Sequence, residues 1–244
     1  MRDWQRYAFD PALARWAGAA NEAATKALAD PAQAHQYRYG RTWFVGVDAL
    51  PNAPDGSLNG VPLHGEVIDG LTRNRWHEAQ LSVTFPGYPQ RMDGESDSQH
   101  RFRVTRDAAH VDGLLPMGPT RRRHLIEPHA FILGLPLNAV SESPLVVWEG
   151  SAAIMNAAFT EALEGVPSAR WSEVDLTEIY QAARKSCFEN CPRVEARAKP
   201  GEALLLHRLT LHGVAPWAAS EPCTEGRRIA YFRPQLENPA DWLP

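Results

Sequence analysis

Proline and glycine residues divide this chain into short segments, and this punctuation limits the folds open to it. The 244 residues include 20 prolines and 17 glycines. Both residue types interrupt regular structure, so the pattern favours many strands and loops over long helices. A chain of this length fits one large domain, and all-β domains commonly reach this size. We therefore expect a mainly β fold with flanking helices in a single domain, residues 1–244.

Two regions have a helical pattern instead. Between Pro11 and Ala29 the apolar residues recur at helical spacing, and Asp10 before Pro11 is a plausible helix start. Residues 152–187 form a second helical stretch, which we interpret as an insertion that is either a lid or a layer covering a sheet. Residues 86–99 have the composition of a polar loop. Strands are expected at 42–47, 81–85, 129–137, 144–148, 203–206 and 228–232.

Charge, cysteine content and hydropathy exclude several classes of protein. The net charge of −4 provides no clustered basic surface for nucleic acid. Cys187, Cys191 and Cys223 form no even disulfide set and have no evident fourth ligand for zinc, so they fit a reducing compartment. The first residues lack the apolar run of a signal peptide, and no stretch approaches the ~20 apolar residues of a membrane span. These features predict a soluble, cytoplasmic protein with neither a nucleic acid nor a membrane as partner.

The most informative chemical pattern is His110-Val111-Asp112 together with His212, about a hundred residues later. Residues i and i+2 of a strand point to the same face, so His110 and Asp112 could reach one ion. His212 has to arrive from a distant strand, which a closed or sandwiched sheet can supply. His207 lies an odd number of residues before His212, so a regular strand turns it to the opposite face. Two imidazoles and one carboxylate are the ligand set that holds non-haem Fe(II).

Three further segments, 138–151, 200–213 and 227–234, accompany these residues. Their order along the chain resembles that of the phytanoyl-CoA dioxygenase-like family. The resemblance covers about residues 100–235. It implies a double-stranded β-helix, which is a cupin-like jelly-roll barrel with iron inside one mouth. It also implies that Fe(II) is the cofactor, that 2-oxoglutarate and O2 are co-substrates, and that His110, Asp112 and His212 are the iron ligands.

The same resemblance implies that an arginine on the last strand binds the far carboxylate of 2-oxoglutarate. The planar guanidinium suits this task because it meets a carboxylate with two parallel hydrogen bonds. Arg227 and Arg228 point to opposite sides of a strand, so only one can enter the barrel. The double arginine of the family favours Arg227, whereas the small Ala230 two places on favours Arg228. We prefer Arg228 and keep Arg227 as the alternative.

The function that this resemblance implies is hydroxylation of a small-molecule metabolite, with 2-oxoglutarate converted to succinate and CO2. Neither the substrate nor the oligomeric state follows from the sequence. Two other functions remain open. The chain could be a non-catalytic jelly-roll binding module, or a cupin-like metalloenzyme that does not use 2-oxoglutarate. The arginine run 121–123 is interpreted as a solvated loop rather than as a site for an anionic substrate, and Trp217 is a candidate for the substrate pocket.

Overall fold

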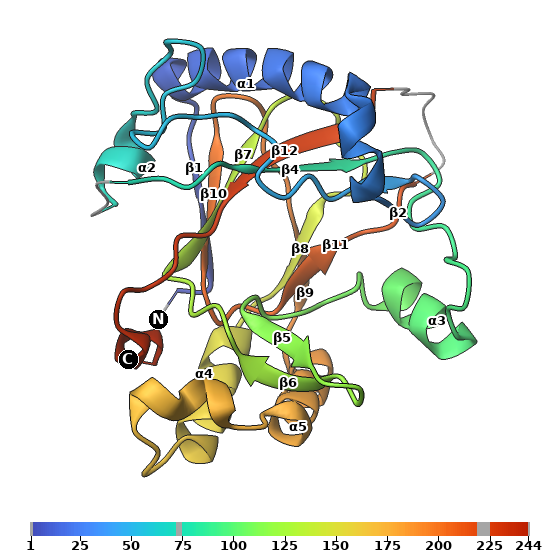
Figure 1. Ribbon diagram of the computed structural model, residues 1–244, viewed down its shortest axis with the longest axis vertical. Coiled ribbons are helices and arrows are strands. Elements are labelled where there is room, and N and C mark those ends of the chain that lie inside the picture. Colours follow the sequence, from blue (N-terminus) through green and yellow to red (C-terminus); the bar gives the residue numbers. More distant parts are fainter. Residues whose placement is uncertain (1, 72–74, 219–224, 244) are drawn as a thin grey trace.

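The fold is built on two antiparallel β-sheets with helices at both ends (Figure 1). This computed structural model describes residues 2–71, 75–218 and 225–243. The larger sheet has seven strands in the order β1-β10-β7-β12-β4-β3-β2, and the smaller has the order β11-β8-β9. The larger sheet consists of β1 (Trp4–Tyr7), β2 (Tyr37–Arg38), β3 (Trp43–Phe44), β4 (Gln80–Thr84), β7 (Phe131–Pro136), β10 (Ala203–His207) and β12 (Arg227–Phe232). The smaller consists of β8 (Leu145–Trp148), β9 (Arg193–Ala196) and β11 (His212–Val214).

The remaining elements flank these sheets. A separate hairpin pairs β5 (Leu114–Met117) with β6 (Arg122–Leu125). The α-helices are α1 (Pro11–Ala29), α2 (Glu66–Asp69), α3 (Asp97–Thr105), α4 (Ser151–Ala162) and α5 (Thr177–Asn190). Short 3-10 helices are η1 (Pro31–Gln36), η2 (Ser168–Glu173) and η3 (Pro239–Trp242). Within the described residues, no helix is long and apolar enough to cross a membrane.

The central strands of the larger sheet are buried on both faces, which explains their short apolar runs. In β7, Leu133 and Leu135 belong to the core beneath α1, whereas Ile132 points to the other face and packs with residues of β8. Side chains of a strand alternate between its two faces, so one strand contributes to two cores. Most of the expected strands are confirmed within one or two residues, but the stretch 42–47 is extended only at Trp43–Phe44.

Helix α1 covers the outer face of the larger sheet at the top of Figure 1. Its bounds confirm the expected helix, and the side chain of Asp10 accepts a hydrogen bond from the backbone N–H of Ala12 at 2.7 Å. Trp16 is fully buried, and its indole N–H donates to the carbonyl of Gly56 at 2.9 Å. Its ring also lies 5.8 Å from that of Phe232 in β12. The helix is therefore fixed to the sheet by one large aromatic side chain whose polar atom is satisfied.

Helices α4 and α5 account for the expected helical stretch 152–187 and build a second core. Their buried residues pack with Trp148 of β8 and with the β5–β6 hairpin. Val111, which lies between two of the predicted metal ligands, belongs to this core and donates its backbone N–H to the Tyr180 hydroxyl of α5 at 3.3 Å. These helices thus support the predicted metal-ligand segment from behind.

The polar loop expected at 86–99 is wrong at its end, because helix α3 begins at Asp97. Ser96 caps it, with the side chains of Ser96 and Gln99 each bonding the backbone N–H of the other residue. This reciprocal capping box is a recognisable sequence signal for a helix start. The strongly polar composition of the helix hid it.

Replacing Trp16 with alanine should destabilise the protein by about 3–5 kcal/mol, the usual cost of deleting a buried aromatic side chain. The loss combines the cavity left beneath α1 with the unsatisfied carbonyl of Gly56. Chemical denaturation with a fluorescence or circular dichroism readout measures the change. The exposed neighbour Arg15→Ala is the control and should change stability little. Equal stability of the two variants would contradict the packing described.

Candidate metal centre

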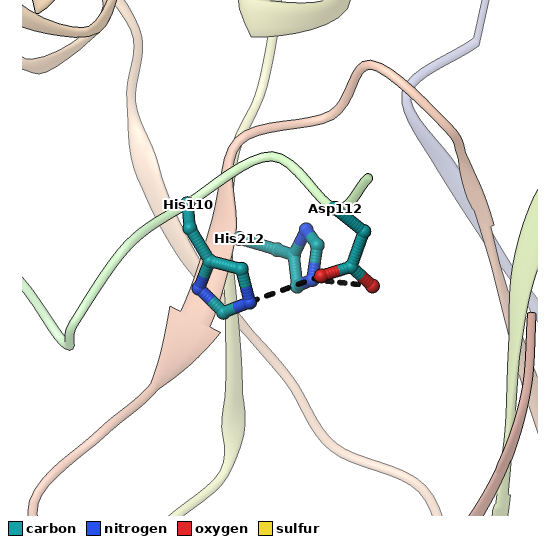
Figure 2. A group of neighbouring side chains, drawn as sticks. All are labelled: His110, Asp112 and His212. Atoms are coloured by element: carbon teal, nitrogen blue, oxygen red, sulfur yellow. Dashed lines mark ion pairs between the residues drawn. The ribbon is translucent and has the colours of Figure 1, made fainter. Parts of the chain in front are cut away.

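The side chains of His110, Asp112 and His212 converge on one point (Figure 2). One ligand atom from each lies within 4.8 Å of the other two. Nε2 of His110 is 3.1 Å from Oδ1 of Asp112, and Nε2 of His212 is 3.8 Å from Oδ2. These are separations that donors around one small divalent cation would have. The structure therefore brings together the three residues that the sequence singled out.

The backbone arrangement that achieves this differs in part from the expected one. His110 and Asp112 do not lie on a regular strand. His110 forms an isolated bridge with His212, donating its N–H to the His212 carbonyl at 2.8 Å and accepting the reverse bond at 3.0 Å. The chain then turns at once, and Gly113 has a φ of +87°. One antiparallel bridge is enough to place both imidazoles side by side, with ring centroids 4.8 Å apart.

Gly213 allows this bridge to form, because the chain before His110 packs directly on it. A Cβ atom at Gly213 would lie 2.1 Å from the carbonyl oxygen of Asp107. That same carbonyl accepts the N–H of Val214 at 3.0 Å. The glycine after the distal histidine thus has a steric reason, which is the close approach of a second backbone.

An ion pair between buried Asp107 and the partly exposed Arg193 holds the other side of this contact. The carboxylate of Asp107 receives two hydrogen bonds from Arg193 of β9, at 2.7 and 2.9 Å. Asp107 and Ala108 both have a φ of +53°, a conformation that side chains rarely adopt. A forked guanidinium gives directional bonds to a carboxylate, so it fixes this unusual turn. No sequence motif marks Asp107 or Arg193, because the two residues are far apart in the chain.

Each imidazole is oriented by its second nitrogen. Nδ1 of His110 lies 3.0 Å from the carbonyl of Ala108, and Nδ1 of His212 lies 2.9 Å from the carbonyl of Thr210. A carbonyl can only accept, so each Nδ1 carries a proton and Nε2 is the nitrogen left to face Asp112, whose contacts outweigh burial and raise the pKa of His110. Metal-bound histidines characteristically have such partners, which fix the tautomer and the direction of the ring.

The protonation states also suit a cation. Burial disfavours the charged form of Asp112, but Arg233 and the two histidines outweigh it and hold the pKa of this carboxyl well below its usual range. Burial lowers the pKa of His212 to about 4. At neutral pH the site therefore offers a carboxylate and a neutral imidazole, the forms that bind metal.

The three side chains line a cavity of about 100 Å³ between the two sheets, which we call the metal cavity. The His110 side chain is 51% exposed, whereas those of Asp112 and His212 are buried. Apolar side chains and a few polar groups form the remaining wall: Trp43, Gln80, Ser82, Ile132, Leu145, Val214, Tyr231 and Arg233. Trp43 and Arg233 were missed in the sequence, because no motif marks them.

The two candidate arginines lie on opposite faces of β12, as strand alternation predicts. Arg228 is directed at α1, where it donates to the side chains of Asn21 and Thr25 at 2.9 and 2.8 Å. Arg227 lies on the other face, which also carries Tyr231 of the metal cavity. The Tyr231 hydroxyl interacts with the Arg227 guanidinium, whose pKa is lowered by burial. Arg227 therefore lies on the strand face of the metal cavity, and Arg228 on the face of α1.

Arg227 also lines a second cavity, of about 280 Å³, at the start of β12. Three further basic side chains surround this cavity, against one carboxylate from Glu202. Glu202 already accepts a hydrogen bond from the backbone of Lys199 at 2.8 Å. The basic residues are Arg6, Lys199, Arg197 and Arg227. Tyr231, on the metal cavity, and Arg227, on this basic cavity, lie four residues apart on one strand face.

Other residues that the sequence raised have structural surroundings. His207 lies in β10 away from the metal cavity, and its Nδ1 accepts the N–H of Leu209 at 3.2 Å. Arg122 pairs with Asp175 and Glu178, which accounts for part of the arginine run. Trp217 is buried but does not line the metal cavity. Cys223 and part of the loop between β11 and β12 lie outside the described residues.

Comparisons with known proteins give likeness in structure only. No protein-family model and no curated relative matches the sequence, so the phytanoyl-CoA dioxygenase-like family stays a prediction. EctD from S. alaskensis with bound Fe is 16% identical at a TM-score of 0.46, with 95% of this chain and 72% of that chain covered. AviO1 from Streptomyces viridochromogenes Tue57 is 12% identical at 0.46, with coverages of 97% and 90%. A structure of EctD from S. alaskensis with 2-oxoglutarate and 5-hydroxyectoine is 16% identical at a TM-score of 0.44, with 95% of this chain and 71% of that chain covered. At this level of likeness no residue role passes to this chain.

Replacing Gly213 with alanine should weaken metal binding by at least about tenfold, since a new Cβ separates the segment 107–110 from β11 and displaces His110. Isothermal titration with Co(II) measures the loss. Gly18→Ala is the matched control, because a Cβ there meets nothing within 4 Å. Wild-type affinity in the Gly213 variant would show that the bridge does not position the ligands.

Proposed function

We propose that this protein is an Fe(II)- and 2-oxoglutarate-dependent oxygenase that hydroxylates a small molecule, with release of succinate and CO2. One observation carries the proposal: two oriented imidazoles and a carboxylate converge at the wall of a cavity. This ligand set holds non-haem Fe(II) on one face and leaves the opposite positions open. When bound, such iron supplies the oxidation chemistry with O2 that amino-acid side chains lack.

The donor chemistry fits iron. In both histidines Nδ1 faces a backbone carbonyl, which leaves Nε2 as the nitrogen that would bind the metal. Asp112 is the single carboxylate, and its low pKa keeps it anionic. Thiolates, which would favour zinc or an iron–sulfur cluster, are absent from the group. His110, Asp112 and His212 would therefore hold Fe(II).

The strand order supports a double-stranded β-helix. The larger sheet contains the run β10-β7-β12-β4, and the smaller contains β9-β8-β11 with the His110 bridge at its far edge. With that bridge added, the smaller sheet would face this four-stranded run as the second sheet of a jelly roll. His212 of β11 and the bridged segment with His110 and Asp112 would then lie on one side of the cavity, and β12 and β4 of the larger sheet on the other.

For 2-oxoglutarate we propose Arg227 as the partner of the far carboxylate. It is buried on the strand face that carries Tyr231, and Tyr231 reaches from this arginine to the metal cavity. The neighbouring basic side chains make the region favourable for a dianion. Arg228 does not suit this role, since its guanidinium is bound to α1.

The small, largely apolar cavity is the proposed place of the substrate's reacting carbon. Trp43, Leu145 and Val214 would exclude water from it. A dry pocket protects a reactive site from side reactions, which is the contribution the protein makes beyond holding the metal.

Two tests separate this proposal from its alternatives. Anaerobic addition of Fe(II) and 2-oxoglutarate should produce a weak visible charge-transfer band, and aerobic incubation with a metabolite library should release succinate. Asp112→Ala should remove both signals because it leaves two neutral ligands for the ion. Its fold is checked by circular dichroism. Absence of the band in the native protein would favour a binding module, and succinate release by Asp112→Ala would contradict the assigned ligands.

Arg227→Met and Arg228→Met form a matched pair, since the two side chains are 8% and 9% exposed on one strand. Arg227→Met should raise the apparent Kd for 2-oxoglutarate roughly 10- to 100-fold, the effect of losing charge-assisted hydrogen bonds worth about 1.5–3 kcal/mol. Arg228→Met should leave that Kd unchanged and lower thermal stability, because it releases α1. A larger rise of the Kd in Arg228→Met than in Arg227→Met would instead assign the far carboxylate of 2-oxoglutarate to Arg228. An unchanged Kd in both variants would assign the far carboxylate to another residue, whereas native protein that binds metal but no 2-oxoglutarate would favour a metalloenzyme without this co-substrate.

A further inference from the structure

Arg233, just after β12, contacts Asp112, one of the three predicted metal ligands. Its Nη1 lies 3.2 Å from Oδ2 of Asp112, and its Nη2 donates to the side-chain oxygen of Gln80 in β4. The Gln80 amide in turn donates to the carbonyl of Val45 at 2.8 Å. The backbone N–H of Arg233 donates to Nε2 of His77 at 2.8 Å. The guanidinium is thus fixed at both ends and is only 27% exposed.

The two oxygens of Asp112 consequently differ in their surroundings. Oδ1 lies 3.1 Å from Nε2 of His110, whereas Oδ2 receives the arginine at 3.2 Å and lies farther, at 3.8 Å, from Nε2 of His212. An aspartate with both oxygens free can bind a metal through one oxygen or chelate it through both. A bound guanidinium on Oδ2 disfavours chelation, because that oxygen would have to give up a charge-assisted hydrogen bond.

We propose that Arg233 is a positioning residue of the metal centre, which holds Oδ2 of Asp112 so that the carboxylate offers the metal Oδ1 alone. The proposal rests on the metal centre of the proposed function and deepens it. With Oδ2 of Asp112 held by Arg233, the coordination positions opposite the ligands would stay free. Chelation by Asp112 would occupy one more position, and the proposed co-substrates need the open face. Arg233 acts through Asp112 and is not itself a metal ligand.

The sign of the electrostatic effect makes the proposal testable. A cation beside the ligand carboxylate repels a bound metal ion, so removing the charge alone should tighten metal binding. Loss of positioning has the opposite effect, because an outer partner that orients a ligand is typically worth 10–100-fold in metal affinity. Weaker binding after removal of Arg233 therefore reports positioning rather than charge.

The experiment titrates the full chain with Co(II), whose visible spectrum depends on the number of ligands and which needs neither 2-oxoglutarate nor O2. Arg233→Met should bind Co(II) 10–100-fold more weakly, with an altered spectrum as Asp112 becomes free to chelate. Arg233→Lys keeps the charge and one donor and should recover part of the affinity. Gln80→Met removes one hydrogen-bond partner of the guanidinium but keeps Arg233 itself. It should change the Co(II) affinity and the spectrum in the same direction as Arg233→Met, by a smaller amount. Arg122→Met, which removes an arginine from a surface ion pair, is the control.

Affinity equal to or tighter than that of the native protein in Arg233→Met, or an unchanged spectrum, would overturn the proposal. Thermal unfolding identifies a variant that has lost its fold, and Gln80→Met then decides the matter. Failure of the proposed function is distinguishable: native protein that binds Co(II) but neither binds nor turns over 2-oxoglutarate would refute the oxygenase and leave the role of Arg233 intact. Native protein that binds no Co(II) would refute the metal centre and this assignment together.

Discussion

The single backbone bridge between His110 and His212 is the contact on which the site depends. Two hydrogen bonds join His110, whose segment is not a regular strand, to His212 in the short strand β11. The bridge exists because Gly213 lets the carbonyl of Asp107 come close, and because Arg193 fixes the turn at Asp107. A site assembled through one bridge relies on its flanking contacts, which explains why two sheets, a glycine and an ion pair meet at this point.

The electrostatic design of the centre follows from placing one anion among several potential cations. Asp112 is buried, which alone would favour its neutral form. Arg233 supplies the charge that keeps it ionised, while burial keeps His212 neutral. The carboxylate is thus stabilised by a permanent cation that cannot bind a metal, and the imidazole remains a free base. The ligands are prepared for a divalent ion by the protein itself.

The sequence predicted the fold where the residues are strongly periodic and the site where a motif marks it. Helix α1 matches its expected bounds, and the two histidines and the aspartate meet as expected. The regular strand at His110 was not found, because two residues of matching parity can also converge through a bridge and a turn. Asp107, Arg193, Arg233 and Trp43 could not be foreseen, since they reach the site from separate strands and loops and only the tertiary fold brings them together.

The choice between Arg227 and Arg228 illustrates how the two faces of β12 divide their work. The even positions, Ala230 and Phe232, pack beneath α1, and Arg228 extends this face by binding the helix. The odd positions face the interior, so Arg227 and Tyr231 fall in line with the metal cavity. A small residue at 230 therefore makes room for a helix rather than for a ligand. A small residue in a strand indicates that another group packs closely against it. Which group this is depends on the face of the strand to which the residue points.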